Sequence, residues 1–274
     1  MCNFHSLLCV FSLVSSLRGV YTFPLAPRAD PTYPQIGFTS QPLNDSKAIA
    51  LTFDDGPDSD GVITKGIADV LKSKGVPATF FINTNNTADV MASIGAQDAI
   101  KYIYENNFTM GSHTVNHVNF SAVSNDVVEQ EISGVQTTIA TILDEPDFKA
   151  TLSRAPYGIP YEPGAPFASD VTRIAPIAAK YGVHIGWSID SNDWKCKDDQ
   201  DAAGGVQCVK DNVMNQVKGG SWGIILFHAI YHNTPDALSD VIDELVREGY
   251  HFVSVEDIVK AKYGVVSAEL IRGK

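Results

Sequence analysis

The chain is poor in cysteine and in basic residues and has no long apolar run, and each of these shortages argues against a kind of site or partner. Its 4 cysteines include no closely spaced CxxC pair, which argues against a thiolate metal site. Lysine and arginine number 20 against 32 acidic residues, for a net charge of −12. This balance argues against nucleic acid or anionic lipid as a partner, since both require basic patches. The chain also has no low-complexity tail and no repeat of fixed period.

One short apolar segment lies near the N-terminus, at residues 7–14, and small residues follow it at Ser15, Ser16 and Gly19. The segment is too short to cross a bilayer, and no second apolar run follows it. We therefore interpret residues 1–20 as a signal peptide and expect a secreted, extracellular or cell-wall-associated protein. No lysine or arginine precedes the apolar segment, so a mistaken start codon or an N-terminal anchor is the alternative.

In an exported protein, the remaining cysteines predict a disulfide and several asparagines predict glycosylation sites. Once the leader is removed, Cys196 and Cys208 remain, and we expect them to form a disulfide. In the loop-entropy model such a bond is worth about 3 kcal/mol for a loop of about a dozen residues. A metal pair is the alternative, but the spacing is far wider than a CxxC hook. Asn-X-Ser/Thr sequons predict N-glycosylation at Asn44, Asn85, Asn107 and Asn119.

The order of helical and strand-like segments predicts an α/β fold. Residues 21–45 are rich in proline and lack periodicity, which indicates an extended arm. From residue 46 to 265, apolar runs such as 48–53 and 78–82 alternate with helical patterns that end at glycine. Repeated βα units imply a parallel sheet, and six or seven units, as counted here, favour a barrel over an open sheet. In barrels the active residues lie at the carboxyl ends of the strands.

Two polar clusters follow predicted strands and together could bind a metal. Asp54 and Asp55 come directly after a buried strand that a Gly-Pro pair ends, so both carboxylates can turn into the barrel mouth. A polar turn is the alternative for this pair. His113 and His117 are four residues apart and can face one metal, although two core or surface histidines would look the same. Two imidazoles and a carboxylate form a three-ligand site with room for water, as in catalytic zinc sites.

Three further polar residues lie at or after predicted strand ends. Arg154 can hold a neighbouring carboxylate ionised, although a lone arginine is usually a solvated charge. Asp193 lies in a polar stretch after the strand predicted at 183–187. His228 ends a strongly apolar strand, where it is either a satisfied core histidine or a candidate general acid or base.

Five segments together resemble the motifs of the polysaccharide deacetylase family, carbohydrate esterase family 4 with its NodB-homology domain. They are, in chain order, residues 52–57, 113–117, 154–157, 193–194 and 226–228. Each motif is weak alone, but five in order, each at a predicted strand end, are very specific. The resemblance covers roughly residues 46–260. It implies a single-domain distorted (β/α) barrel, with seven parallel strands, that holds one divalent metal ion, zinc or a similar ion such as cobalt.

The resemblance also implies how the motif residues would remove an acetyl group. Asp55, His113 and His117 would hold the metal, which lowers the pKa of a bound water and stabilises the developing oxyanion. Asp54 would be the general base that takes the proton of that water. Arg154 would hold Asp54 ionised.

The same resemblance places the proton donor and the substrate pocket. His228 would protonate the departing amine, with Asp193 orienting the imidazole and keeping it charged. The backbone N–H of Tyr157 would be a second oxyanion donor. Trp194 and Leu226 would form walls of the pocket for the sugar and its acetyl group.

We therefore expect a secreted, metal-dependent enzyme that removes N-acetyl groups from a GlcNAc-containing polysaccharide or oligosaccharide, such as chitin or peptidoglycan. We expect it to act as a monomer without a nucleic-acid or membrane partner. O-deacetylation of acetylated xylan is the alternative, because the same groups can cleave an ester. A non-catalytic carbohydrate-binding protein should have lost a motif residue, and a phosphatase-like hydrolase should show more metal ligands, so both are disfavoured.

Overall fold

The computed structural model describes residues 32–39, 43–162, 168–196 and 202–272. The predicted signal peptide at 1–20 lies outside these ranges, as does the first part of the predicted arm at 21–45. Both boundaries, and those of the domain predicted at 46–265, stay predictions. Within the described ranges, no helix is long and apolar enough to cross a membrane.

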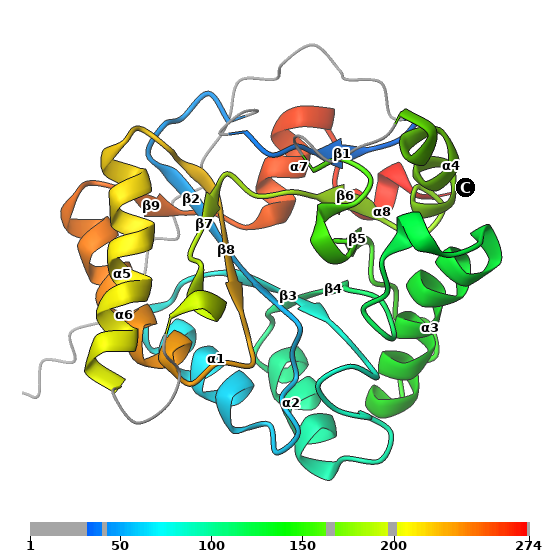
Figure 1. Cartoon of the computed structure of the whole chain (residues 1–274), viewed down its shortest axis with the longest axis horizontal. Coiled ribbons are helices and arrows are strands. Elements are labelled where there is room, and N and C mark those ends of the chain that lie inside the picture. The colour runs from blue at the N-terminus through cyan, green and yellow to red at the C-terminus, as the bar shows by residue number, and fades with distance from the viewer. Residues whose placement is uncertain (1–31, 40–42, 163–167, 197–201, 273–274) are drawn as a thin grey trace, which may run out of the picture.

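The described residues form a single α/β domain around a curled sheet in which every pairing between strands is parallel (Figure 1). The strands follow the order β1-β6-β5-β4-β3-β2-β8-β7, and β9 pairs with β2. This distorted half-barrel confirms the predicted fold class. The strands are β1 Gln35–Ile36, β2 Ala48–Asp54, β3 Ala78–Ile82, β4 Thr109–Ser112, β5 Leu152–Ser153, β6 Val183–Ile185, β7 Ile189–Asp190, β8 Gly223–His228 and β9 His251–Phe252.

The sheet has nine strands in the described residues, two more than the seven expected. One is β1, because part of the predicted arm pairs with β6. The other is β7, because the strand predicted at 183–187 divides: Gly186 N–H donates to the Ile36 carbonyl, and Ser188 N–H to the Ile224 carbonyl. The chain thus crosses from one end of the sheet to the other. A Cβ at Gly186 would lie 2.9 Å from the backbone of Gly37, so only glycine fits this crossing.

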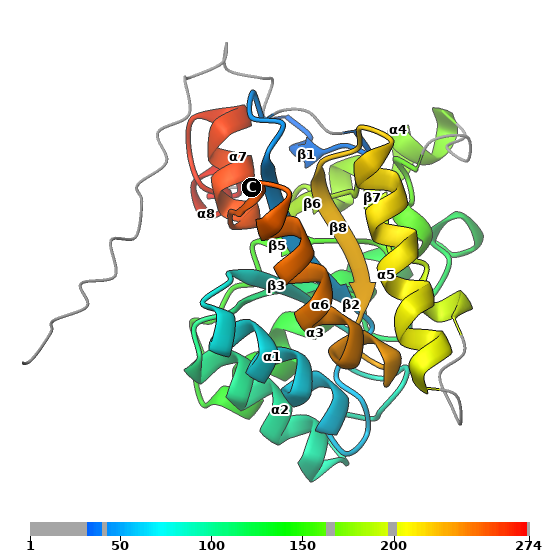
Figure 2. The same cartoon turned by 90° about the vertical axis from the view of Figure 1, so that its left-hand side faces the viewer.

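Helices surround the outside of the curled sheet, and α5 and α6 lie side by side against β7 and β8 (Figures 1 and 2). The α-helices are α1 Val62–Lys74, α2 Ile94–Glu105, α3 Asn125–Leu143, α4 Ala168–Ala178, α5 Ala202–Lys218, α6 Asn233–Arg247, α7 Val255–Tyr263 and α8 Ser267–Leu270. The described residues also form three short 3-10 helices, η1 Phe120–Ala122, η2 Pro156–Gly158 and η3 Asp193–Lys195. Two of these, η2 and η3, carry residues of the predicted site.

The core between sheet and helices explains why the strands are apolar on both faces. All seven residues of β2 are buried. Phe53 in β2 stacks on Phe80 in β3 and on Phe227 in β8, with ring centroids 5.2 and 5.5 Å apart. Buried aromatic pairs of this kind add about 0.5–1.5 kcal/mol each beyond the area they bury. They hold the three central strands together, and the site lies at the ends of these strands.

The four asparagines of the predicted glycosylation sequons, Asn44, Asn85, Asn107 and Asn119, are all exposed. Exposure is what N-glycosylation requires, because the glycan is bulky and polar. Whether any of the four carries a glycan stays a prediction.

Candidate active site and metal centre

The polar residues singled out in the sequence follow strands that all run in one direction. Asp54 ends β2 and His228 ends the neighbouring β8, and the two residues are paired in the register of the sheet. His113 comes directly after β4, and Arg154 directly after β5. Because parallel strands end at the same edge, the fold brings these residues to one end of the curled sheet.

Asp55, His113 and His117 form a cluster that could hold one metal ion. Their candidate ligand atoms all lie within 4.8 Å of one another. Oδ1 of Asp55 lies 3.3 Å from Nε2 of His113 and 3.4 Å from Nε2 of His117. This buried oxygen makes no hydrogen bond within the described residues. A buried carboxylate oxygen without a donor is costly, and a cation among the three atoms would satisfy it.

The loop between β4 and η1 holds the histidines in place. Nδ1 of His113 lies 2.7 Å from the carbonyl oxygen of Arg154, which favours the tautomer that leaves Nε2 free for a metal. The side chain of Asn83 donates to the carbonyls of His113 and Thr114. Thr114 Oγ1 accepts the N–H of His117 at 3.1 Å. The ligands are therefore preorganised by neighbours that touch no metal themselves.

Electrostatics inside the cluster suit cation binding. Burial raises the pKa of Asp55, but the neighbouring His113 imidazole outweighs it, and the pKa falls to about 2. Burial also lowers the pKa of His113, yet Asp54 and Asp55 together raise it above its usual value. Burial and the charge of His113 lower the pKa of His117. Asp55 is an anion at neutral pH, and a bound cation would compete with protons for the imidazole of His113.

Arg154 is fully buried and holds Asp54 rigidly. Its Nη1 lies 2.8 Å from Oδ1 of Asp54 and also donates to Thr52 Oγ1 at 2.9 Å. Its Nε and Nη2 donate to the carbonyls of Ile185 and Gly186. The guanidinium thus fixes one carboxylate oxygen, while Oδ2 lies 3.8 Å from Nε2 of His113, toward the metal cluster. Removing one partner of a buried pair of this kind costs about 3–5 kcal/mol.

His228 and Asp193 form a second charged pair at the same end of the sheet. Nδ1 of His228 lies 2.7 Å from Oδ1 of Asp193, and the backbone N–H of His228 donates to Oδ2 at 2.7 Å. Burial lowers the pKa of His228, but Asp193 outweighs it and raises the pKa to about 9. His228 therefore carries a proton at neutral pH and can act as a general acid.

The sequence model of the polysaccharide deacetylase family matches residues 42–184, which is more than half of the chain. The chain belongs to this family. The two carboxylates, the two metal-cluster histidines and the buried arginine all lie within the matched residues.

Several known proteins and solved structures are similar to this chain at moderate identity. An uncharacterised 30.6 kDa protein of Geobacillus stearothermophilus is 30% identical over 79% of this chain and 72% of its own length. The peptidoglycan-N-acetylglucosamine deacetylase PgdA of Listeria monocytogenes is 29% identical over 79% of this chain, but the chain spans only 40% of that longer protein. The solved chitin deacetylase of Colletotrichum lindemuthianum is 24% identical, with a TM-score of 0.66 over 84% of this chain and 92% of its own, and shows the shared fold alone.

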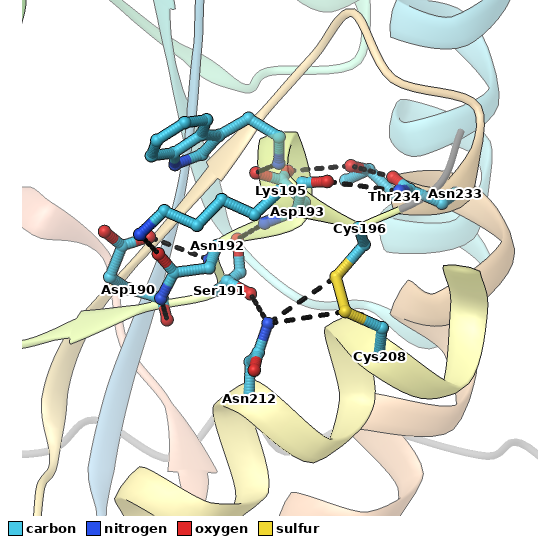
Figure 3. The surroundings of a disulfide bond; sticks show 11 residues. Asp190, Ser191, Asn192, Asp193, Lys195, Cys196, Cys208, Asn212, Asn233 and Thr234 are labelled. Atoms are coloured by element: carbon cyan, nitrogen blue, oxygen red, sulfur yellow. Dashed lines mark hydrogen bonds between the residues drawn. A yellow bond between two sulfur atoms is a disulfide. The ribbon is translucent and has the colours of Figure 1, made fainter. Parts of the chain in front are cut away.

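The predicted disulfide is present in this polysaccharide deacetylase. Cys196 and Cys208 are bonded, 12 residues apart, and link the end of η3 to α5 (Figure 3). The side chain of Asn212 on α5 lies beside both sulfur atoms and donates to the carbonyl of Ser191 at 2.9 Å. The disulfide and Asn212 together fasten the loop that carries Asp193 to α5.

The predicted substrate residues differ in exposure. Tyr157 is 56% exposed and Trp194 is 50% exposed, which suits contact with a sugar. The ring of Tyr157 lies edge-on to His117, with centroids 5.2 Å apart. Leu226 is only 5% exposed and lies on the same face of β8 as His228. The roles of these three residues as oxyanion donor and pocket walls stay predictions.

Several residues that support the site were missed in the sequence. Asn83 and Glu131 hold the histidine loop: Glu131 accepts from the backbone and the side chain of Asn116 at 2.7 and 2.6 Å. Thr234 contacts the carboxylate of Asp193. Asn83 follows directly after β3, so its position at a strand end was an available signal. Glu131 lies within α3, and no local pattern distinguishes it from a surface glutamate.

Proposed function

We propose that this chain is a metal-dependent deacetylase that removes N-acetyl groups from polysaccharides built of GlcNAc or MurNAc units. The observation that carries the proposal is the placement of two separate proton-transfer pairs at one end of the sheet. Asp54 with Arg154 forms one pair, and His228 with Asp193 forms the other. Both lie with the Asp55, His113 and His117 cluster at the carboxyl ends of the strands.

The two pairs suit the two proton movements that cleavage of an acetamide requires. Oδ2 of Asp54 is not bonded to Arg154 and lies toward the metal cluster, where it can accept a proton from an attacking water. His228 holds a proton up to about pH 9, because Asp193 raises its pKa to about 9. An amine leaves only when it is protonated, and a charged histidine at the end of the strand next to the base can supply that proton.

The cluster of Asp55, His113 and His117 fits a divalent ion, and two imidazoles with a carboxylate favour zinc or a similar borderline metal. Such an ion would supply a water of lowered pKa and polarise the acetyl carbonyl. Asp55 Oδ1 and Nε2 of both histidines are the atoms that would hold it. The chain's own contribution is to fix these atoms through Asn83 and the carbonyl of Arg154.

The substrate class comes from the relatives and from the exposed aromatic residues. PgdA acts on peptidoglycan N-acetylglucosamine by its name, and the similar solved enzyme is a chitin deacetylase. Tyr157 and Trp194 offer exposed rings beside the site, and aromatic rings pack well against the apolar faces of sugars. Export through residues 1–20, and contact with an extracellular or cell-wall polymer, are part of this proposal.

The proposal is tested by acetate release from chitin oligomers, peptidoglycan and acetylated xylan, with the metal content measured on the same sample. We expect acetate from the N-acetylated substrates in proportion to bound metal. His113→Ala should lose both the metal and the activity. If acetate were released from acetylated xylan alone, the proposed activity would be O-deacetylation instead of N-deacetylation. Full activity in protein stripped of metal would overturn the mechanism.

A further inference from the structure

The first turn of α6 lies against the loop that carries Asp193. Thr234 is completely buried, and its hydroxyl donates to Oδ2 of Asp193 at 2.8 Å (Figure 3). Among the described residues, the other acceptor of this hydroxyl is Oδ1 of Asn233, which is more distant at 3.4 Å, so the single proton goes to the carboxylate. The side chain of Asn233 donates to the backbone carbonyl of Asp193 at 3.2 Å. The start of α6 thus donates hydrogen bonds to both the side chain and the backbone carbonyl of Asp193.

Within the described residues, the carboxylate of Asp193 accepts four hydrogen bonds, and only one of them comes from a side chain other than His228. Oδ1 accepts from Nδ1 of His228 and from the backbone N–H of Trp194 at 2.9 Å. Oδ2 accepts from the backbone N–H of His228 and from Thr234. The Trp194 N–H belongs to the same loop as Asp193 and moves with it. Thr234 is therefore the side chain that ties this carboxylate to a separate, rigid element.

A purely structural role for the hydroxyl does not account for its position. The start of α6 is already held by apolar burial, since Ala237, Leu238 and Val241 are fully buried. Valine has nearly the same shape as threonine and could pack at the same place. The hydroxyl adds a donor aimed at the one carboxylate that orients the imidazole, and a hydrogen bond to a charged group is about twice as strong as a neutral one.

We propose that Thr234 is a positioning residue for proton donation: its hydroxyl holds the Asp193 carboxylate in the orientation that keeps His228 aimed at the departing amine. The inference rests on the proposed deacetylase function. When the C–N bond of the acetamide breaks, the imidazolium proton of His228 passes to the amine nitrogen, and Asp193 retains its charge. Thr234 touches neither substrate nor metal and acts through Asp193.

The test compares Thr234→Val and Thr234→Ala with Thr234→Ser in the zinc-loaded full chain. With tetra-N-acetylchitotetraose, loss of the hydroxyl should lower kcat roughly ten- to a hundredfold, the factor expected for a hydrogen bond to a charged group. KM and zinc content should stay within about twofold of the parent protein. Thr234→Ser retains the hydroxyl and should recover most of kcat. Using both valine and alanine keeps the test usable if one variant folds poorly.

Thr79→Val is the matched control. Thr79 is as buried as Thr234, but its hydroxyl has no hydrogen-bond partner within the described residues. Removing this hydroxyl should leave kcat unchanged, so a general effect of deleting a buried hydroxyl is separated from an effect on Asp193.

Two further readouts separate positioning from simple loss of structure. With 4-nitrophenyl acetate, whose leaving group needs no proton, Thr234→Val should keep kcat within about threefold of the parent protein. In proton NMR, the parent protein and Thr234→Ser should share a far-downfield Nδ1–H signal of His228, which Thr234→Val should lose or shift. Its assignment is checked by its absence in His228→Gln.

The outcomes are distinct. If the parent chain releases acetate and Thr234→Val matches it in kcat and in the NMR signal, the inference is wrong. Equal losses on the amide and the nitrophenyl ester would also overturn it, since they would show a structural effect. If the zinc-loaded parent releases no acetate from any substrate, the proposed function is wrong, and the NMR comparison alone then decides whether Thr234 positions the His228–Asp193 pair.

Discussion

Strained backbone residues gather around the site. Asp55, Thr114, His117 and Tyr157 have φ angles of 68°, 73°, 55° and 60°, in the left-handed region, which threonine and tyrosine rarely adopt and which aspartate and histidine adopt more readily. Strain of this kind costs about 1–3 kcal/mol per residue and persists only where the surroundings impose it. The other non-glycine residues with positive φ in the described chain are all asparagine or aspartate, which tolerate it. Thr114, which lies between the two cluster histidines, and Tyr157 are therefore held in place at the expense of local stability.

Asp54→Asn should separate catalysis from metal binding. Asparagine keeps the shape and can still accept from Arg154, but it cannot take a proton, so we expect kcat to fall by a factor of about 100 or more. Zinc content should remain, because Asp54 is not one of the clustered ligands. The exposed Asp98 provides a control, Asp98→Asn, that should behave as the parent protein. Loss of zinc in Asp54→Asn would show that Asp54 is itself a ligand.

The pH dependence of kcat should report the state of His228. Its pKa is raised to about 9, because Asp193 outweighs the effect of burial, with Asp54 and Asp55 adding to the shift. The acid is protonated below this value, so kcat should fall as the pH rises through it. A bound cation nearby disfavours the imidazolium, so the alkaline limb should lie at or below pH 9. Asp193→Asn removes the raising charge and should move the limb to lower pH. An alkaline limb that does not move would show that another group is the acid.

The loop around η3 is held to the rest of the fold by a covalent link, the Cys196–Cys208 disulfide. This loop runs from Asp193 to Cys196. The disulfide to Cys208 and the side chain of Asn212 join it to α5. Replacing both cysteines, Cys196→Ser with Cys208→Ser, should cost about 3 kcal/mol of stability in the loop-entropy model and lower the melting temperature. We expect kcat to fall as Asp193 becomes less fixed, with zinc content unchanged. A melting temperature equal to that of the parent protein would contradict this account.

The elements and motif positions could be predicted because their signals are local. Apolar runs marked β2, β3 and β8, and Gly75 marked the end of α1, where it has φ 66° as the left-handed C-cap. The supports of the site were not predictable, because their partners are distant in the sequence. Thr234 lies 41 residues from Asp193, and Asn83 lies 30 residues from His113. In the sequence, the triplet at 233–235 carries no signal, because its third residue is proline and it is not a glycosylation sequon.

At the scale of the whole molecule, the curl of the sheet brings separate motifs together. The segment from Gly186 to Ser188 joins β1 at one end of the strand order to β8 near the other. Arg154 donates to the carbonyl of Gly186, which lies within this crossing, and to that of Ile185, which precedes it. It also donates to Asp54 on the central strand. The crossing was not predictable from local pattern, since residues 183–187 look like one continuous strand. As a consequence, one residue, Arg154, contacts both the candidate site and the segment that crosses between the two ends of the sheet.

A metal ion bound to both the β2 and the β4 loops should therefore stabilise the entire domain, not just the site. Its ligands, Asp55, His113 and His117, come from two strands of the sheet separated by β3. An ion at a hundred times its Kd should add about 2.7 kcal/mol to the free energy of unfolding. In a domain of this size that shift raises the melting temperature by about 5 °C or more, and a chelator should reverse it. His113→Ala should abolish the shift, whereas His232→Ala, at an exposed histidine outside the cluster, should keep it. A zinc-induced shift that survives His113→Ala would place the ion elsewhere.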